Sequence, residues 1–174
     1  MLVTRDGNNQ LIILAWMVCL VENSKNYEYL ALHCKKVSGL SDYLDRPQAL
    51  LYSDRHKGIP AFEKVFQCGK ANCIVHIIDN IRDACKKYPG ANVGFHAEQI
   101  HKIQQCHTRK EYDRKLALFA KGYPECAAYV DALPHETTFL YAIMEAGFTT
   151  HGHRTSNIAE IVNNVLRDAR YYLR

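Results

Sequence analysis

No apolar run in the sequence is long enough to cross a membrane. The longest one, Leu11–Val21, has eleven residues, whereas a bilayer core requires about 20. No small-residue cleavage site follows this run, so it does not fit a secretory signal, and its lack of alternation predicts a strand buried on both faces. The chain also lacks repeats and low-complexity tracts. With 174 residues, 48% of them hydrophobic and 23% charged, it is typical of one globular domain and not of a disordered or coiled-coil protein.

Neither charge nor cysteine content is extreme. The chain has 22 Lys and Arg against 18 Asp and Glu, a net charge of +4. This net positive charge permits a phosphate-bearing partner but is small for a dedicated nucleic-acid binder. The seven cysteines are odd in number and scattered, so we expect reduced thiols in a cytosolic or nuclear protein.

The first half of the chain predicts a hairpin followed by βα units. The turn Asp6-Gly7-Asn8-Asn9 joins two short apolar stretches, as tight antiparallel hairpins require. Asn23 or Ser24 can cap a helix over about 27–36, followed by a polar loop through 42–47. The next segment, 48–53, predicts a short strand with Asp54 at its carboxyl end. Pro60 suits the first turn of the helix that follows.

The second half is mostly helical. Residues 73–76 predict another strand passing into a helix that ends near 87. Thr108 and Glu111 form a capping-box pattern, and Tyr123-Pro124 and Leu133-Pro134 divide the helical region. From Ser156 the apolar residues at 158, 161, 162, 165, 166, 169, 172 and 173 follow the spacing of an amphipathic helix. The order of elements therefore predicts an α/β fold, a mixed sheet flanked by helices.

Four segments in this order resemble the Mutator-like element (MULE) transposases. The first lies around the hairpin, with Ala15-Trp16 and Val21-Glu22-Asn23 and with Tyr27 and Tyr29 where the family usually has two Trp. The others are Ser53-Asp54-Arg55-His56-Lys57-Gly58, the Cys73-x-x-His76 pair followed by Asn80, and His151-Gly-His153-Arg-Thr-Ser-Asn157-Ile-Ala-Glu160. Each motif is common by itself, and only their combination and order indicate the family.

The resemblance implies an RNase H-like DDE core. Residues 1–87 would form the sheet portion, 88–150 a helical insertion, and 151–174 the helix with the third carboxylate, all in one domain. Asp54 and Glu160 would be catalytic ligands of two Mg²⁺ or Mn²⁺ ions, because two-metal phosphoryl transfer requires hard oxygen ligands from separate elements. Without the resemblance, Asp54 would be an ordinary turn residue and Glu160 a favourable first-turn glutamate.

The sequence departs from the family at its start. The family's first catalytic Asp lies in an Asp-Gly-Thr strand that would precede Met1, and no residue here corresponds to it. Asp6 is not a substitute, because the hairpin turn would lie at the opposite end of the sheet from Asp54. A smaller departure is Ile13, where the family usually has Pro. We therefore expect an N-terminally truncated RNase H-like sheet that lacks its first strand.

A second metal site is a weaker expectation. Cys73 and His76 could form half of a zinc site completed by His151 and His153, since tetrahedral zinc takes two such pairs from separate segments. The second pair is spaced by one residue, outside the usual range. The alternative is a buried thiol and a capped imidazole.

Basic residues flank both carboxylates. Arg55, Lys57, Arg154 and Arg167 could form a rim for DNA phosphates or simply a solvated surface. The function implied is DNA transposition by strand cleavage and transfer in the intact parent protein, in the nucleus. We expect this chain to be inactive alone. Homo-oligomerisation stays open, and no membrane partner is expected. One alternative is a non-enzymatic, domesticated nuclear module that binds DNA or protein. Another is a zinc-stabilised α/β domain unrelated to transposition.

Overall fold

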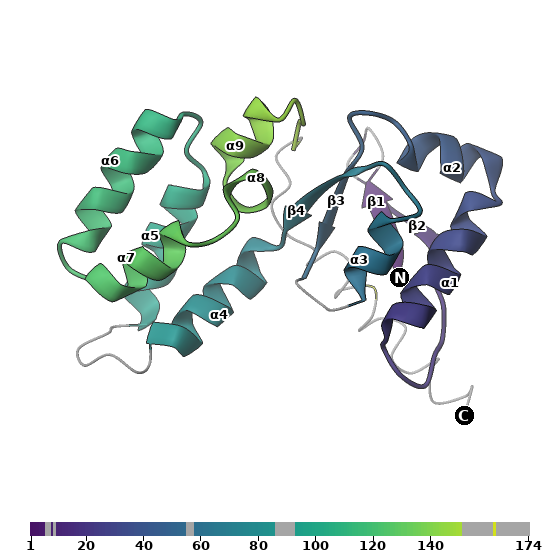
Figure 1. The fold of residues 1–174 in the computed structure, drawn as a ribbon, viewed down its shortest axis with the longest axis horizontal. Helices are drawn as coiled ribbons and strands as arrows, with labels where there is room; N and C mark the ends of the chain where they lie inside the picture. Colours follow the sequence, from purple (N-terminus) through teal and green to yellow (C-terminus); the bar gives the residue numbers. More distant parts are fainter. Residues whose placement is uncertain (6–7, 9, 55–57, 86–92, 151–161, 163–174) are drawn as a thin grey trace. The chain divides into compact units, whose positions relative to one another are not determined.

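The fold is a mixture of helices and short strands in two compact units. The computed structural model describes residues 1–5, 8, 10–54, 58–85, 93–150 and 162. Within these residues it contains nine helices and two two-stranded sheets (Figure 1). The first unit comprises residues 1–49, 55–69 and 156–174, and the second comprises 50–54 and 70–155. None of the helices in these described ranges is both long and apolar enough to span a membrane.

The first unit begins with the predicted antiparallel hairpin. Strands β1 (Leu2–Arg5) and β2 (Leu11–Ala15) pair from Arg5 with Leu11 to Leu2 with Ala15, and the register shifts by one residue between Leu2 and Val3. The prediction of a long strand buried on both faces is wrong. β2 ends at Ala15, and its residues Leu11, Ile12 and Ile13 are 40–44% exposed. An apolar run predicts that a segment can be buried, but a two-stranded sheet covers only part of it.

Three helices complete the described part of this unit. The helix α1 (Ser24–Lys35) starts as predicted, with the Asn23 side chain accepting a hydrogen bond from the Asn26 backbone N–H at 3.0 Å. The expected polar loop after it is wrong in part, because Ser38–Leu44 forms α2. Pro60 lies in the first turn of α3 (Ile59–Glu63), as predicted, and α3 packs against α1.

The second unit contains a parallel pair of strands. Backbone bonds join Gly69 N–H to Ala49 O and Cys73 N–H to Ser53 O, both at 2.8 Å. The offset is 20 residues in both cases (69 − 49 and 73 − 53), as only parallel strands give. These are β3 (Leu50–Ser53) and β4 (Gly69–Asn72). The expected strand over 73–76 is wrong: β4 ends one residue before Cys73, and His76 lies in the following helix.

Six helices follow β4 in the described part of this unit. They are α4 (Ile74–Cys85), α5 (Val93–Gln104), α6 (Arg109–Ala120), α7 (Pro124–Asp131), α8 (His135–Thr138) and α9 (Leu140–Glu145). The Thr108 hydroxyl accepts from the Glu111 N–H at 3.2 Å, as the capping pattern predicts. The helices enclose one apolar cluster, whose fully buried members include Ile77, Ile81, Ile100, Ile103, Tyr112, Val130, Phe139 and Ile143.

Candidate functional site

The candidate catalytic carboxylate lies at the carboxyl end of β3, where the sequence predicts it. Asp54 directly follows Ser53, whose carbonyl accepts the Cys73 N–H at the end of β4. Because β3 and β4 are parallel, their carboxyl ends form one edge of the sheet, and Asp54 and Cys73 both lie there. Asp54 is partly exposed, so its oxygens can reach a solvent-borne ligand. Open α/β sheets place their binding sites at this kind of edge.

Cys73 and His76 occupy the start of α4 at the same edge. Cys73 is 1% exposed, and its carbonyl accepts the Ile77 N–H at 3.1 Å in the first turn of the helix. His76 is partly buried, one helical turn further on. The two residues are three apart in the chain, with Cys73 between β4 and α4 and His76 in the first turn of α4. Within the described residues, no group of three or more His, Cys, Asp or Glu could hold a metal ion.

Several of the predicted site residues are outside the described part of the chain. The site residues outside the described part are Glu160, His151, His153, Arg55, Lys57, Arg154 and Arg167. The two-metal pair, the completed zinc site and the basic rim therefore stay predictions.

A buried polar anchor that no sequence pattern indicated supports the site edge. The Asn72 side-chain amide, at the end of β4, donates to the hydroxyls of Thr137 at 2.9 Å and Thr138 at 3.1 Å on α8. Asn72 is 4% exposed and Thr138 is 2% exposed. The contact spans 65 residues, so no local pattern could have indicated it. It fixes the strand end next to the candidate site against the helical part of the same unit.

A second polar network holds the helices together. The Tyr112 hydroxyl donates to Asp131 at 3.0 Å, and the Arg109 guanidinium donates to the Tyr141 hydroxyl at 3.2 Å. His135 bonds through Nδ1 to Tyr141 and packs edge-on against the Tyr112 ring. Burial and the neighbouring Asp131 carboxylate raise the pKa of Tyr112 far above its ordinary value. The neutral Tyr112 hydroxyl is therefore the donor to Asp131, and the network joins α6, α7, α8 and α9.

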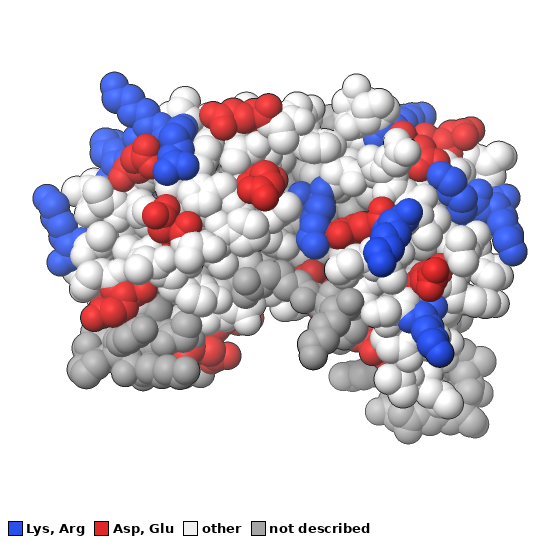
Figure 2. Space-filling model, in the orientation of Figure 1, with Lys and Arg blue, Asp and Glu red and all other residues white. Residues whose placement is uncertain are grey.

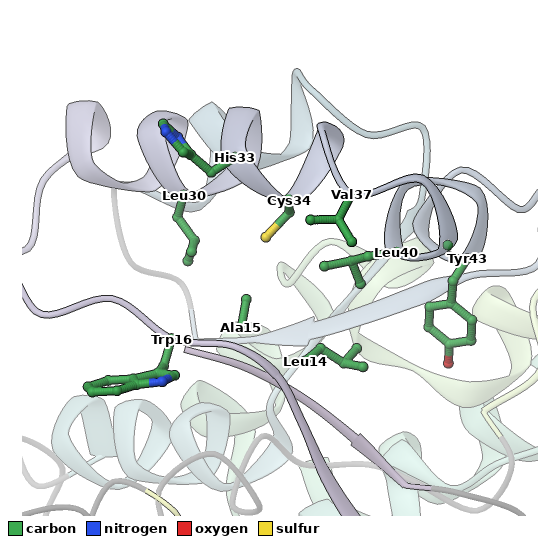
Figure 3. A pocket seen from close by; sticks show the side chains of 10 residues that line it. Leu14, Ala15, Trp16, Leu30, His33, Cys34, Val37, Leu40 and Tyr43 are labelled. Atoms are coloured by element: carbon green, nitrogen blue, oxygen red, sulfur yellow. The ribbon is translucent and has the colours of Figure 1, made fainter.

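An apolar groove lies between β2 and the helices α1 and α2 of the first unit. Its volume is about 630 Å³, and its lining residues are Leu14, Ala15, Trp16, Leu30, His33, Cys34, Val37, Gly39, Leu40 and Tyr43. Figure 3 shows Leu30 and Cys34 pointing from α1 towards the strand, whereas the His33 ring lies away from it. Burial raises the pKa of the Cys34 thiol, so the thiol is protonated at neutral pH and is a poor nucleophile. The groove can bury apolar groups but holds no catalytic set.

The cysteines do not all meet the expectation of reduced thiols. Cys19, Cys34, Cys68 and Cys106 are free, but Cys126, buried on α7, is disulfide-bonded. Disulfide formation depends on a Cα separation of about 4.4–6.8 Å, and spacing along the sequence does not reveal that distance.

The comparison with protein families identifies the class of protein. The family model described as "Transposase, Mutator family" matches residues 1–174, the whole chain. The chain therefore belongs to the Mutator family of transposases, and the resemblance found in its motifs is confirmed. No curated protein and no solved structure matches it. Membership implies a role in transposition and, in general, binding to DNA.

Proposed function

We propose that this chain is part of the catalytic domain of a Mutator-family transposase, with an RNase H-like fold and Asp54 and Glu160 as two of its three metal-binding carboxylates. The observation that carries the proposal is the position of Asp54 at the carboxyl edge of the parallel β3–β4 pair. A partly exposed carboxylate at a strand end fits a hard divalent cation. By resemblance, the strand with the first Asp would pair beside β3.

The chemistry assigned to the site is the cleavage and joining of DNA strands. Two Mg²⁺ or Mn²⁺ ions, when bound, supply the activation of the attacking hydroxyl or water and the stabilisation of the leaving oxygen. The role of Asp54 is to hold a metal at a fixed position, because β3 is anchored to β4 and β4 is anchored to α8 through Asn72. Residues 1–174 contain two of the three carboxylates, so we propose that they do not catalyse strand transfer by themselves.

The test uses the chain joined to an upstream strand that carries the Asp-Gly-Thr sequence. With Mg²⁺ or Mn²⁺ we expect cleavage of a labelled transposon-end duplex, and Asp54→Asn should reduce the rate on the order of 100-fold or more, since several kcal/mol of metal-dependent stabilisation are lost. The matched control is Asp42→Asn, which makes the same change at an exposed position on α2 and should leave the rate unchanged. Unaltered cleavage by the Asp54 variant would refute the assignment. Binding of DNA without any cleavage would favour the non-enzymatic nuclear module instead.

The zinc site is a separate part of the proposal. Cys73 directly precedes α4 and His76 lies in the first turn of that helix, so the two residues are close enough in the chain to supply two ligands of a tetrahedral site. Metal analysis of protein purified without chelator should give about one zinc per chain, and the Cys73→Ser variant should contain none. Wild-type protein without zinc would show that the two residues are a buried thiol and an imidazole with structural roles only.

Imaging of the tagged chain in its host cell tests the proposed nuclear location.

A further inference from the structure

The positive charge of the second unit is concentrated on one helix. From Arg109 to Lys121, α6 and its C-cap contain five cations and two anions, a net charge of 5 − 2 = +3, compared with +4 for the whole chain. The three helices that follow have no Lys or Arg, and each has at least one Asp or Glu. Within the second unit the positive charge is therefore a local property of α6.

Ion pairs divide the five cations of α6 into two sets. Arg109 pairs with Asp113 and Lys115 pairs with Glu111, both at 2.8 Å, so both anions of the helix are neutralised within it. The other three cations are Lys110, Arg114 and Lys121. All three are exposed, and none forms an ion pair with another residue in the described ranges.

The three remaining cations lie on one line. At about 100° per residue, Lys110, Arg114 and Lys121 fall within about 40° of helix surface, and at 1.5 Å rise they span roughly 16 Å along the axis. The opposite face packs into the core through Tyr112 and Phe119. We call Lys110, Arg114 and Lys121 the α6 basic stripe. Figure 2 shows Lys and Arg side chains gathered over α6, at the upper left.

We propose that the α6 basic stripe binds the phosphate backbone of duplex DNA. This inference rests on the proposed function, which requires DNA to be held near the catalytic domain, and it assigns that contact to a specific surface. A row of cations without anionic partners suits the phosphate backbone of a duplex, in which each strand has one negative charge per about 3.4 Å of helix axis. The exposed face also contains Ala117 and the 55% exposed Leu118, but no Asn or Gln. It therefore offers contacts to phosphates and no side-chain amide for reading adenine.

The experiment measures the salt dependence of binding to a labelled non-specific duplex by fluorescence anisotropy, with the 174-residue chain. Each phosphate neutralised contributes about 0.9 to the slope of log K against log salt. The variant Lys110→Gln/Arg114→Gln/Lys121→Gln should therefore have a slope smaller by about 2.7 and, at low salt, an affinity reduced on the order of tenfold or more. The control Lys25→Gln/Lys36→Gln/Lys64→Gln removes the same charge from exposed positions of the first unit and should retain most of the slope.

The outcomes separate this inference from the proposed function. Three outcomes would overturn the proposal that the stripe binds DNA. They are an unchanged slope in the α6 variant, an equal loss of slope in the control, and no binding by the wild-type chain at low salt. Tighter binding to polyglutamate than to duplex of equal charge would show that the partner is an acidic protein. The stripe is tested by DNA binding without divalent metal, and the role of Asp54 is tested by metal-dependent cleavage, so a failure of the metal-site assignment leaves the result for the stripe intact.

Discussion

The anchor between β4 and α8 allows a quantitative test of how the site edge is held. In Asn72→Ala, two neutral hydrogen bonds to Thr137 and Thr138 are lost, each contributing about 1 kcal/mol to stability. The Thr137 hydroxyl keeps a bond to the Pro134 carbonyl at 3.3 Å, whereas the buried Thr138 hydroxyl loses its Asn72 partner, at a cost of about 1 kcal/mol.

One contribution has the opposite sign. The Asn72 Oδ1 is buried and accepts no hydrogen bond from any described residue. Removing this atom therefore increases the stability of the folded protein by about 1 kcal/mol. The net expectation is a loss of about 2 kcal/mol, which for a chain of this length lowers the melting temperature by about 4–8 °C.

The assay is urea unfolding followed by far-UV circular dichroism, because six of the nine described helices belong to the unit that contains this anchor. Asn80→Ala is the matched control, since it makes the same change at an exposed position of α4. A surface substitution of this kind alters stability by less than about 0.5 kcal/mol. If Asn72→Ala unfolded at the same urea concentration as Asn80→Ala, the anchor would contribute nothing and the reasoning would be wrong.

Asn72→Asp provides an independent check on burial. Its carboxylate cannot donate to either threonine, and burying a charge costs more than burying an amide. Burial would raise the pKa of the new carboxyl above the ordinary value of about 3.9. The loss of stability caused by the buried charge should therefore be absent below pH about 3.9. It should grow as the pH rises through the raised pKa of the folded state. A penalty that does not change with pH would mean that position 72 is accessible to water.

Two further predictions concern the helix cap and the cysteines. Thr108→Ala should cost about 1 kcal/mol in thermal unfolding, because the Glu111 N–H loses its cap, and Thr108→Ser should restore most of this. Maleimide labelling followed by mass spectrometry at neutral pH should modify the exposed Cys19 first. Cys34 and Cys106 should react slowly, since both are buried and burial raises the pKa of each thiol. Equal labelling of Cys34 and Cys19 would show that the apolar groove opens in solution.

The features that the sequence predicted well are local ones. Asn23 and Thr108 cap their helices as their residue types suggest, Pro60 lies in the first turn of α3, and a helix boundary falls at Tyr123-Pro124. In each case the cause acts within one helical turn. The position of Asp54 at a strand end belongs to the same class, because a short apolar run followed by Asp contains the necessary information.

The features that the sequence did not predict depend on distant partners. The exposure of Leu11–Ile13 depends on what covers β2, and the bonding of Cys126 depends on a distance in space. The Asn72 anchor joins a strand end to a threonine pair far along the chain. Family resemblance added the identity of the candidate ligands, but their convergence is a three-dimensional property that motifs alone cannot establish.

The close approach of Gly58 to Tyr27 changes how the Ser53–Gly58 motif should be interpreted. A Cβ atom at position 58 would lie 2.1 Å from Cδ2 of the Tyr27 ring, so any side chain there would displace an aromatic residue of α1. The backbone at this position has a φ of −80°, which every residue tolerates. The constraint is therefore spatial and not conformational. The motif therefore includes a packing requirement at Gly58 beside the candidate ligand Asp54. A larger residue at 58 would be acceptable only with a smaller one at 27, so these two distant positions should vary together among sequences that keep this fold.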